Sequence, residues 1–359
     1  MKRHRIAYLC GSDSWGGLEM NQLRNALWMK NRGHEVVVLG WKGSKFIEEA
    51  KKQGLTIHIV PSHKKYYPLL SAIKLAFWLN KNDFPNLIVR AYTDLSLASG
   101  TAFFGGRKLK VYYFMEMNLG GGKKQFFRTI RFNRLAAWCC PLDVLKQQVI
   151  ANTNFNLEKI HVIPSGVDFT NVINEPKELS RKKLNLPEKY FLFGLVGRID
   201  PQKGQLLAVK ALARISDEKV KLVIVGEKTK GEASDYEQEL NEFIYSKNLQ
   251  DRVLFLPFQE NPFVVFNAFD WTLMTSLAET VGMVTIESMA QGTPVIGSNS
   301  GGTTEILNYG KAGLLFEPNN DVDLAEKMKT AISGIQFETK NTVTNFNHKL
   351  VCKKVEDLL

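Results

Sequence analysis

The sequence contains few cysteines and no hydrophobic run long enough to cross a membrane. Its four cysteines, Cys10, Cys139, Cys140 and Cys352, do not have metal-ligand spacing, which excludes a disulfide scaffold and a zinc ribbon. No segment approaches the roughly 20 uninterrupted apolar residues of a spanning helix. The first residues lead directly into a strand-like run ending at Cys10, so no signal peptide is expected. These absences favour a cytoplasmic protein, and 359 residues favour two domains.

The net charge of +11 is distributed unevenly along the chain. Residues 1–180 contain 26 Lys and Arg against 13 Asp and Glu, whereas residues 181–359 contain 21 against 23. A basic half suits nucleic acid, an anionic membrane surface or an acidic substrate. A basic nucleic-acid-binding protein is therefore the alternative from a different class. No recognition helix or aromatic strand motif appears, so we expect no nucleic-acid partner.

Short apolar, β-branched runs alternate with helical periodicity in both halves, which predicts βαβ units and two doubly wound parallel sheets. The polar stretch 171–189 is the expected linker, and 345–359 is expected to form one more helix. Because ligands bind at the carboxyl ends of parallel strands, the site should lie in a cleft between two domains. The expected strands are 6–10, 35–39, 56–60, 87–90, 110–115 and 160–163, then 191–196, 221–225, 253–256, 271–275, 294–297 and 314–316.

Two cations follow the first expected strand of the second half. Gly197-Arg198 ends that strand, and Lys203-Gly204 opens the next helix. Cations on such a strand–loop–helix turn can converge on a diphosphate and stabilise a phosphate leaving group. Two solvated loop charges are the alternative interpretation.

Two carboxylates follow a later strand of the same half. Glu279 falls in the loop after the strand, and Glu287 falls in the next helix. A carboxylate can accept two parallel hydrogen bonds from vicinal hydroxyls of a sugar or ribose. Between them, the amides of residues 281–284 begin a helix, which suits phosphate. A helix-capping Glu and a surface Glu are the alternative interpretation.

Asp321-Val-Asp323 and Gly120-Gly-Gly-Lys-Lys124 resemble functional motifs only superficially. The aspartates precede a helical pattern and are interpreted as capping residues, so no metal site is predicted. The glycine run lacks phosphate-loop spacing and is interpreted as a flexible loop.

Taken in order, the motifs resemble retaining glycosyltransferases of the GT-B fold, sequence family 4 (glycosyl transferases group 1). The resemblance spans nearly the whole chain, and each motif is weak alone. They are Gly16-Gly17-Leu-Glu19, Gly33-His-Glu-Val36, residues 162–168, Gly197-Arg198 with Lys203-Gly204, Glu279 to Glu287, Gly292-Thr-Pro-Val-Ile296 and Gly301-Gly302-Thr-Thr-Glu305.

This resemblance implies an α/β fold of two Rossmann-like domains facing across a cleft. Residues 1–168 would bind the acceptor, 169–344 the nucleotide-sugar, and 345–359 would cross back to the first domain. Arg198 and Lys203 would hold the diphosphate, and Glu279 would act on the donor sugar. Further donor contacts would come from Gly16, Gly17, Gly197, the amides of Gly282, Met283 and Val284, Glu287 at the ribose, and Phe258 and Gln259 at the base.

One departure from the family concerns the loop after the fifth expected strand, where several relatives carry a His. Residues 114–118 contain none, and Glu116 is the candidate for that place. It is either an active-site acid or a structural loop acid. The resemblance implies a nucleotide-sugar donor and no other cofactor.

A basic, aromatic stretch lies at 123–138. On a helix, Lys123, Lys124, Arg128, Arg131 and Arg134 would form one stripe that includes Phe127, Leu135 and Trp138. Such a stripe suits an anionic membrane surface or a lipid-linked acceptor. An ordinary helix with a solvated basic edge is the alternative.

We therefore predict a retaining, metal-independent glycosyltransferase that moves a sugar from a nucleotide-diphosphate sugar to a glycan or lipid-linked acceptor. Cell-surface polysaccharide or lipopolysaccharide biosynthesis is the expected setting, with peripheral association at the cytoplasmic face of a membrane. The alternatives within this fold are a sugar-phosphate synthase and a nucleotide-sugar epimerase.

Overall fold

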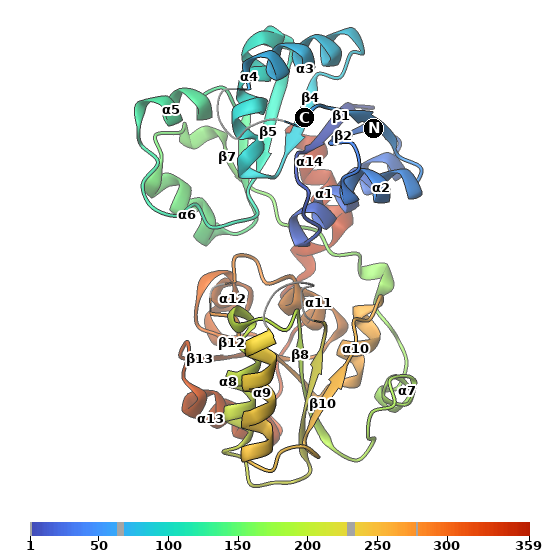
Figure 1. Ribbon diagram of the computed structural model, residues 1–359, viewed down its shortest axis with the longest axis vertical. Coiled ribbons are helices and arrows are strands. Elements are labelled where there is room, and N and C mark those ends of the chain that lie inside the picture. Colours follow the sequence, from blue (N-terminus) through green and yellow to red (C-terminus); the bar gives the residue numbers. More distant parts are fainter. Residues whose placement is uncertain (1, 63–67, 228–233, 278) are drawn as a thin grey trace. The chain divides into compact units, whose positions relative to one another are not determined.

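The protein folds into two α/β units. The computed structural model describes residues 2–62, 68–227, 234–277 and 279–359 (Figure 1). The first unit comprises Met1–Gly166 together with His348–Leu359, and the second comprises Val167–Asn347. The chain therefore passes from one unit to the other twice. In the described part of the chain, no helix is both long and apolar enough to span a membrane.

The first unit is built on a seven-stranded parallel sheet with the order β3-β2-β1-β4-β5-β6-β7. Its alternating side chains enter two cores, since successive residues of a strand point to opposite faces. Ile6 and Tyr8 pack on one side, and Ala7 and Leu9 on the other. The strands are β1 (Arg5–Cys10), β2 (Glu35–Gly40), β3 (Thr56–Ile59), β4 (Asn86–Val89), β5 (Lys110–Phe114), β6 (Ala137–Cys140) and β7 (Ile160–Val162).

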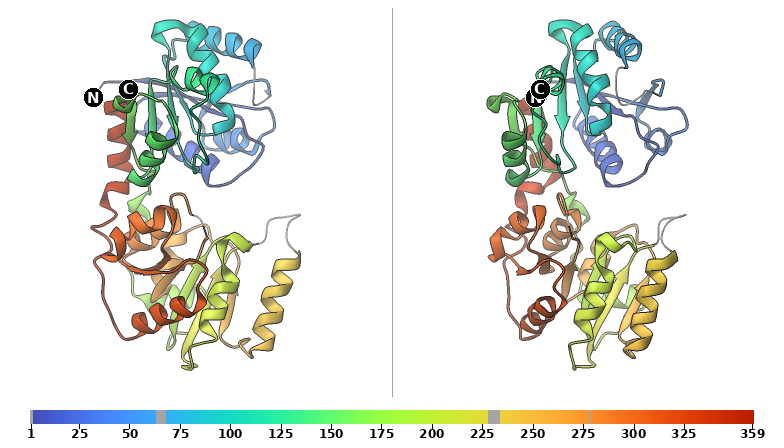
Figure 2. Two further views of the ribbon diagram at one scale, coloured as in Figure 1. Left: turned by 90° about the vertical axis from the view of Figure 1, so that its left-hand side faces the viewer. Right: turned by 60° about the vertical axis from the view of Figure 1, so that its left-hand side comes forward.

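Helices cover both faces of this sheet (Figures 1 and 2). On the Ile6 side lie α1 (Gly17–Asn31), α2 (Lys45–Lys52) and the C-terminal α14 (His348–Leu358). On the Leu9 side lie α3 (Leu69–Lys81), α4 (Leu95–Gly105), α5 (Phe126–Phe132) and α6 (Asp143–Asn152). Helix α14 contributes Val351, Cys352 and Val355 to the core of the first unit.

The second unit contains a six-stranded parallel sheet with the order β10-β9-β8-β11-β12-β13. Its strands are β8 (Phe191–Val196), β9 (Val220–Val225), β10 (Val253–Leu256), β11 (Trp271–Met274), β12 (Val295–Ser298) and β13 (Leu314–Phe316). Helices α8 (Gln205–Leu212), α9 (Ser234–Ser246) and α13 (Asp321–Ile332) pack on one face. Helix α10 (Pro262–Ala268) packs on the other face, where α11 (Met283–Gln291) contributes Val284. Helix α12 (Gly301–Ile306) follows β12.

The two predicted parallel sheets are confirmed, and two local predictions are wrong. Strand β6 (Ala137–Cys140) begins within the last two residues of the stretch 123–138, which we expected to be one basic helix. The expected linker contains helix α7 (Lys177–Lys183), which packs against α10. Its buried Arg181 donates to the carbonyl oxygen of Ala268 and pairs with Asp270 at 2.7 Å. We expected no helix in this stretch because it has no apolar periodicity. Helix α7 forms nonetheless, because polar contacts of side chains such as the buried Arg181 attach it.

Candidate functional site

The strand order of the second sheet reverses between β8 and β11, which are neighbours in space but not in sequence. In open α/β sheets such a switch point is where ligands bind, beyond the carboxyl ends of the strands. Lys203 follows β8 and Glu279 follows β11. Their Nζ and Oε2 atoms are 2.8 Å apart, with 31% and 22% of the two side chains exposed. The structure thus brings together two of the predicted residues at an accessible position.

The loop after β8 holds Lys203 through a tight turn. Asp200 caps a short 3-10 helix at Pro201–Lys203 by accepting from the Gln202 amide. Gly204 follows with φ +73°, and a Cβ there would lie 2.6 Å from the carbonyl oxygen of Thr275. The Thr275 hydroxyl donates to the Lys203 carbonyl oxygen at 2.7 Å. Glycine at 204 therefore lets the loops after β8 and β11 approach each other closely.

The loop after β11 is held by the Gly301-Gly302 turn. The Gly302 amide donates to the carbonyl oxygen of Glu279 at 3.0 Å. Gly301 has φ +56°, and a Cβ there would lie 2.2 Å from that same oxygen. This glycine pair therefore fixes the backbone of Glu279.

Helix α11 begins beside this loop. Gly282, with φ +70°, is its N-cap, and Met283 and Val284 are its first residues. The amides at this end have no partners within the helix and carry the positive end of its dipole. Glu287 lies half-buried one turn further along α11.

Three other predicted donor residues lie on loops of the same edge. Arg198 follows β8, with 61% of its side chain exposed and its guanidinium 3.9 Å from Asp200. Phe258 and Gln259 follow β10; Phe258 is exposed, and the Gln259 amide donates to the Pro257 carbonyl oxygen. A pocket of about 230 Å³, lined by Gly226, Asn241 and Phe255, extends to Pro257, the residue that precedes Phe258 in the sequence. Sequence reasoning did not identify this pocket, which is built from strands and α9 together.

The first sheet has an equivalent switch point between β1 and β4. The loop after β1 is closed by Glu19, whose carboxylate accepts from the Ser12 hydroxyl and the Gly16 amide at 2.7 and 2.9 Å. The buried Asp94 accepts from the Gly11 amide at 2.8 Å. A Cβ on Gly17 would meet no atom within 4 Å. Space for a side chain therefore does not explain glycine at 17.

Glu116 is buried in a network of side chains in the first unit. Its carboxylate pairs with Arg90 and accepts from the hydroxyl of Ser165 and the amide of Asn21. Arg90 also donates to Gln22 at 2.9 Å. Arg90 was missed by sequence reasoning, although its position at the end of β4 was a signal. These contacts favour the structural interpretation of Glu116, and its catalytic role stays a prediction.

The predicted basic helix at 123–138 is wrong. Helix α5 covers only Phe126–Phe132; Lys123 and Lys124 precede it, and Arg134 follows it. Leu135 and Trp138 are buried in the core, and Trp138 belongs to β6. Arg128 and Arg131 lie on α5. The regular spacing of cations suggested one helix, but four consecutive buried residues form a strand instead.

Asp321 and Asp323 lie in the first turn of α13, where Asn320 is the N-cap. Asp321 pairs with Arg214 at 2.6 Å, and Asp323 lies 3.6 Å from Lys327. Across the described residues, no group of three or more His, Cys, Asp or Glu side chains is placed to hold a metal ion.

Comparison with known proteins identifies the second unit. Residues 176–345 match the family model of glycosyl transferases group 1. This segment belongs to that family. The matched segment contains Arg198, Lys203, Glu279 and Glu287. The predicted resemblance to glycosyl transferases group 1 is therefore confirmed for this segment, and the retaining mode stays a prediction.

Curated relatives match the chain over about half of its length. The D-inositol 3-phosphate glycosyltransferase of Stackebrandtia nassauensis is 30% identical over 184 residues, which are 49% of this chain and 41% of the relative. An uncharacterised glycosyltransferase of Methanocaldococcus jannaschii is 29% identical over 200 residues, 54% of this chain and 50% of the relative. The match thus spans about half or less of these relatives.

Solved structures match both units. A glycosyltransferase from Rickettsia africae has a TM-score of 0.85 at 21% identity, covering 100% of this chain and 98% of the other. Anabaena HepE in complex with UDP and glucose has a TM-score of 0.80 at 21% identity, covering 99% of both. These neighbours confirm the predicted GT-B fold class of two Rossmann-like units.

Proposed function

We propose that the chain is a retaining, metal-independent glycosyltransferase that uses a nucleotide-diphosphate sugar. The observation that carries the proposal is the Lys203–Glu279 pair at the switch point of the second sheet. The pair places an ammonium group and a carboxylate, which can accept hydrogen bonds from sugar hydroxyls, at the switch point where open parallel sheets bind ligands. The pair lies within the segment that belongs to glycosyl transferases group 1.

Each group at this edge has a chemical task in the proposal. Lys203 and Arg198 stabilise the negative charge that develops on the leaving diphosphate. The amides of Met283 and Val284 supply donors at the α11 N-terminus. Glu279 accepts hydrogen bonds from donor-sugar hydroxyls. Gly16 and Gly17, where the loop after β1 meets α1 in the first unit, stay predicted donor contacts.

The nucleoside would be held by Glu287, Phe258 and Gln259. The Glu287 carboxylate accepts hydrogen bonds from the ribose hydroxyls. The exposed Phe258 and the neighbouring Gln259 contact the base, beside the pocket bordered by Gly226 and Phe255. Because base and sugar are recognised by the shape of this edge, the proposal names the donor class rather than one nucleotide.

Structures with a similar fold support the choice of donor and acceptor class. Anabaena HepE has been solved with UDP-glucose, at 22% identity and a TM-score of 0.80. The lipopolysaccharide outer core galactosyltransferase WaaB is 20% identical, with a TM-score of 0.76. We therefore propose a glycan or lipid-linked acceptor, used in making a cell-surface polysaccharide or lipopolysaccharide at the cytoplasmic face of a membrane.

The experiment is a thermal-shift titration of the full chain with UDP-, GDP-, ADP- and TDP-sugars. A ligand that binds only the folded state raises the melting temperature with its concentration. We expect one nucleotide series to stabilise the wild type and to lose most of that effect in Arg198→Ala. Arg214→Ala is the matched control, because Arg214 is also a partly exposed arginine but lies beyond the C-terminal end of α8, where it pairs with Asp321.

Stabilisation by none of the four series would contradict the proposal. If one series does stabilise the protein, the reaction product decides between the enzyme activities known for this fold. Transfer with the anomeric configuration retained supports the proposal, whereas consumption of the nucleotide-sugar without acceptor indicates an epimerase. Transfer only to a soluble sugar phosphate indicates a sugar-phosphate synthase.

A further inference from the structure

Three helices on one face of the first sheet carry many exposed apolar side chains. Helices α3, α4 and α5 pack against one another in sequence, α3 on α4 and α4 on α5. Phe126 and Phe127, at the start of α5, are 71% and 80% exposed. Soluble proteins rarely expose so many large apolar side chains on one group of neighbouring helices. The exposed side chains that we call the apolar face are Leu69, Leu70, Ile73, Phe77, Phe103, Phe104, Phe126, Phe127 and Ile130.

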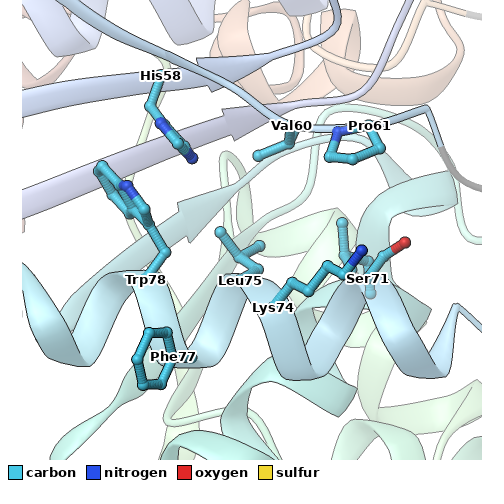
Figure 3. A pocket seen from close by; sticks show the side chains of 9 residues that line it. His58, Val60, Pro61, Ser71, Lys74, Leu75, Phe77 and Trp78 are labelled. Carbon is cyan, nitrogen blue, oxygen red and sulfur yellow. The ribbon is translucent and has the colours of Figure 1, made fainter.

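The apolar face is hollowed on both sides of α3. A pocket of about 590 Å³ lies between α3, α4 and α5, where Leu69, Ala72, Gly100 and Phe127 line it together with Arg128 and Arg131. A second pocket of about 290 Å³ lies between α3 and the end of β3 (Figure 3). There the His58 ring stacks on Trp78 with 3.9 Å between ring centroids. The larger pocket therefore combines an apolar interior with two guanidinium groups.

Five cations lie on α5 or beside its ends: Lys123, Lys124, Arg128, Arg131 and Arg134. In the described part of the chain, none of them forms an ion pair with Asp or Glu. Arg131 is half-buried, and its guanidinium donates to the hydroxyls of Tyr92 at 2.9 Å and Ser96 at 3.1 Å. Arg128 donates to the neutral side chain of Gln125 at 2.9 Å. Neutral partners leave these positive charges uncompensated, which favours an anionic ligand.

We propose that the apolar face binds the surface of an anionic phospholipid bilayer, with a lipid chain entering the pocket between α3, α4 and α5. Apolar burial in the interface and attraction of cations to lipid phosphates act together in such binding. A protein partner would supply fixed carboxylates, whereas a bilayer supplies both the anionic groups and the chains that fit the pocket. The inference deepens the proposed function, and rests on it only in placing a lipid-linked acceptor at this surface.

The first test is cosedimentation of the full chain with vesicles. We expect binding to phosphatidylcholine mixed with phosphatidylglycerol, and much weaker binding to phosphatidylcholine alone. Phe126→Ser/Phe127→Ser and Lys124→Gln/Arg128→Gln should each weaken binding about tenfold or more, by removing apolar area or charge. Equal binding to both vesicle types, or no loss in either double variant, would overturn the proposal.

Matched controls come from exposed residues outside the apolar face. Tyr245→Ser changes an exposed aromatic on α9 of the second unit. Lys353→Gln/Lys354→Gln removes two exposed charges on α14. Both controls should bind vesicles like the wild type, and a comparable loss in either would also overturn the proposal. All variants should keep their stabilisation by nucleotide-sugar, so failure of vesicle binding and failure of donor binding are separate results.

A fluorescent label can locate the contact. All four native cysteines are buried, and burial raises the pKa of Cys140 and of Cys352 to about 12. A thiol introduced as Phe127→Cys is therefore the accessible one for labelling. An environment-sensitive dye at 127 should shift to the blue on anionic vesicles, and one introduced as Tyr245→Cys should not. An unchanged spectrum at 127 during vesicle binding would overturn the assignment to this face.

Discussion

Replacing Gly301 with alanine should disturb both the stability of the second unit and its donor site. Gly301 has φ +56°, and an added Cβ would lie 2.2 Å from the carbonyl oxygen of Glu279. That oxygen belongs to backbone that also accepts from the Gly302 amide, so it cannot rotate away as a side chain could. The loop carrying Glu279 must therefore move.

The size of the effect can be worked out with a matched glycine. An alanine in the left-handed region costs about 1–2 kcal/mol, and overpacking adds about 1–3 kcal/mol. We expect Gly301→Ala to lower the free energy of unfolding by about 2–5 kcal/mol in total. Gly334 also has a positive φ, +94°, but an added Cβ there meets no atom within 4 Å. Gly334→Ala should therefore show only the conformational cost.

The assay is urea unfolding of both variants, followed by calorimetric titration of the folded proteins with the nucleotide-sugar found in the thermal-shift panel. Gly301→Ala should unfold at lower urea than Gly334→Ala and bind the donor at least about tenfold more weakly, because misplacing a positioned group reduces binding and turnover steeply. Equal unfolding midpoints together with wild-type donor binding would refute the contact between Gly301 and the Glu279 loop as the reason for this glycine.

Three further predictions concern charged groups. Lys203→Met should change the free energy of unfolding by less than about 1 kcal/mol, since the pair of Lys203 with Glu279 is partly exposed. Calorimetry should nevertheless show donor binding weakened by about 1.5–3 kcal/mol. The control variant Lys329→Met should bind the donor like the wild type. Arg90→Leu leaves the buried Glu116 carboxylate without its ion-pair partner and should lower the free energy of unfolding in urea by about 3–5 kcal/mol. The double variant Arg90→Leu/Glu116→Leu should be more stable than Arg90→Leu, and equal stability of the two would argue against this reason. Glu356→Gln should cost about 1–2 kcal/mol at neutral pH, because Arg32 and His34 lose their carboxylate. The hydrogen bond from Arg32 lowers the pKa of Glu356 below 4.5, so the advantage of the wild type should persist above that value and disappear as pH falls through the lowered pKa; a constant difference in urea unfolding at acid pH would contradict it.

The strands were predictable because they are short apolar runs, which are buried on both faces in the middle of each sheet, and because their alternation with helices determines a parallel sheet. Strand β6 escaped because the cations before it suggested a longer helix, and a run as short as Ala137–Cys140 has little signal of its own. Helix α7 was missed because polar contacts hold it. Arg181 donates to the Ala268 carbonyl oxygen, Lys177 pairs with Asp270, and Ser180 accepts from Asn267. Neither β6 nor α7 shows the periodic spacing of apolar residues from which strands and helices are predicted.

The candidate site divides in the same way. Lys203 and Glu279 could be named because each follows a strand end, and the order of motifs resembles a known family. Their direct contact joins residues 76 positions apart, so no local spacing could predict it. The Arg90–Glu116 pair likewise depends on β4 and β5 being neighbours, which is why Glu116 could be interpreted as a free loop acid from the sequence.

The return of α14 to the first unit has a consequence for the order of events during synthesis. The second unit is one continuous segment and can complete its fold once residue 347 has left the ribosome. The first unit, although translated earlier, lacks Val351, Cys352 and Val355 from its core until α14 has been made. During synthesis of the second unit, the apolar residues that α14 later covers on the Ile6 face of the first sheet therefore stay exposed. Chains that stall late in translation should be recognised by chaperones through the half that was made first.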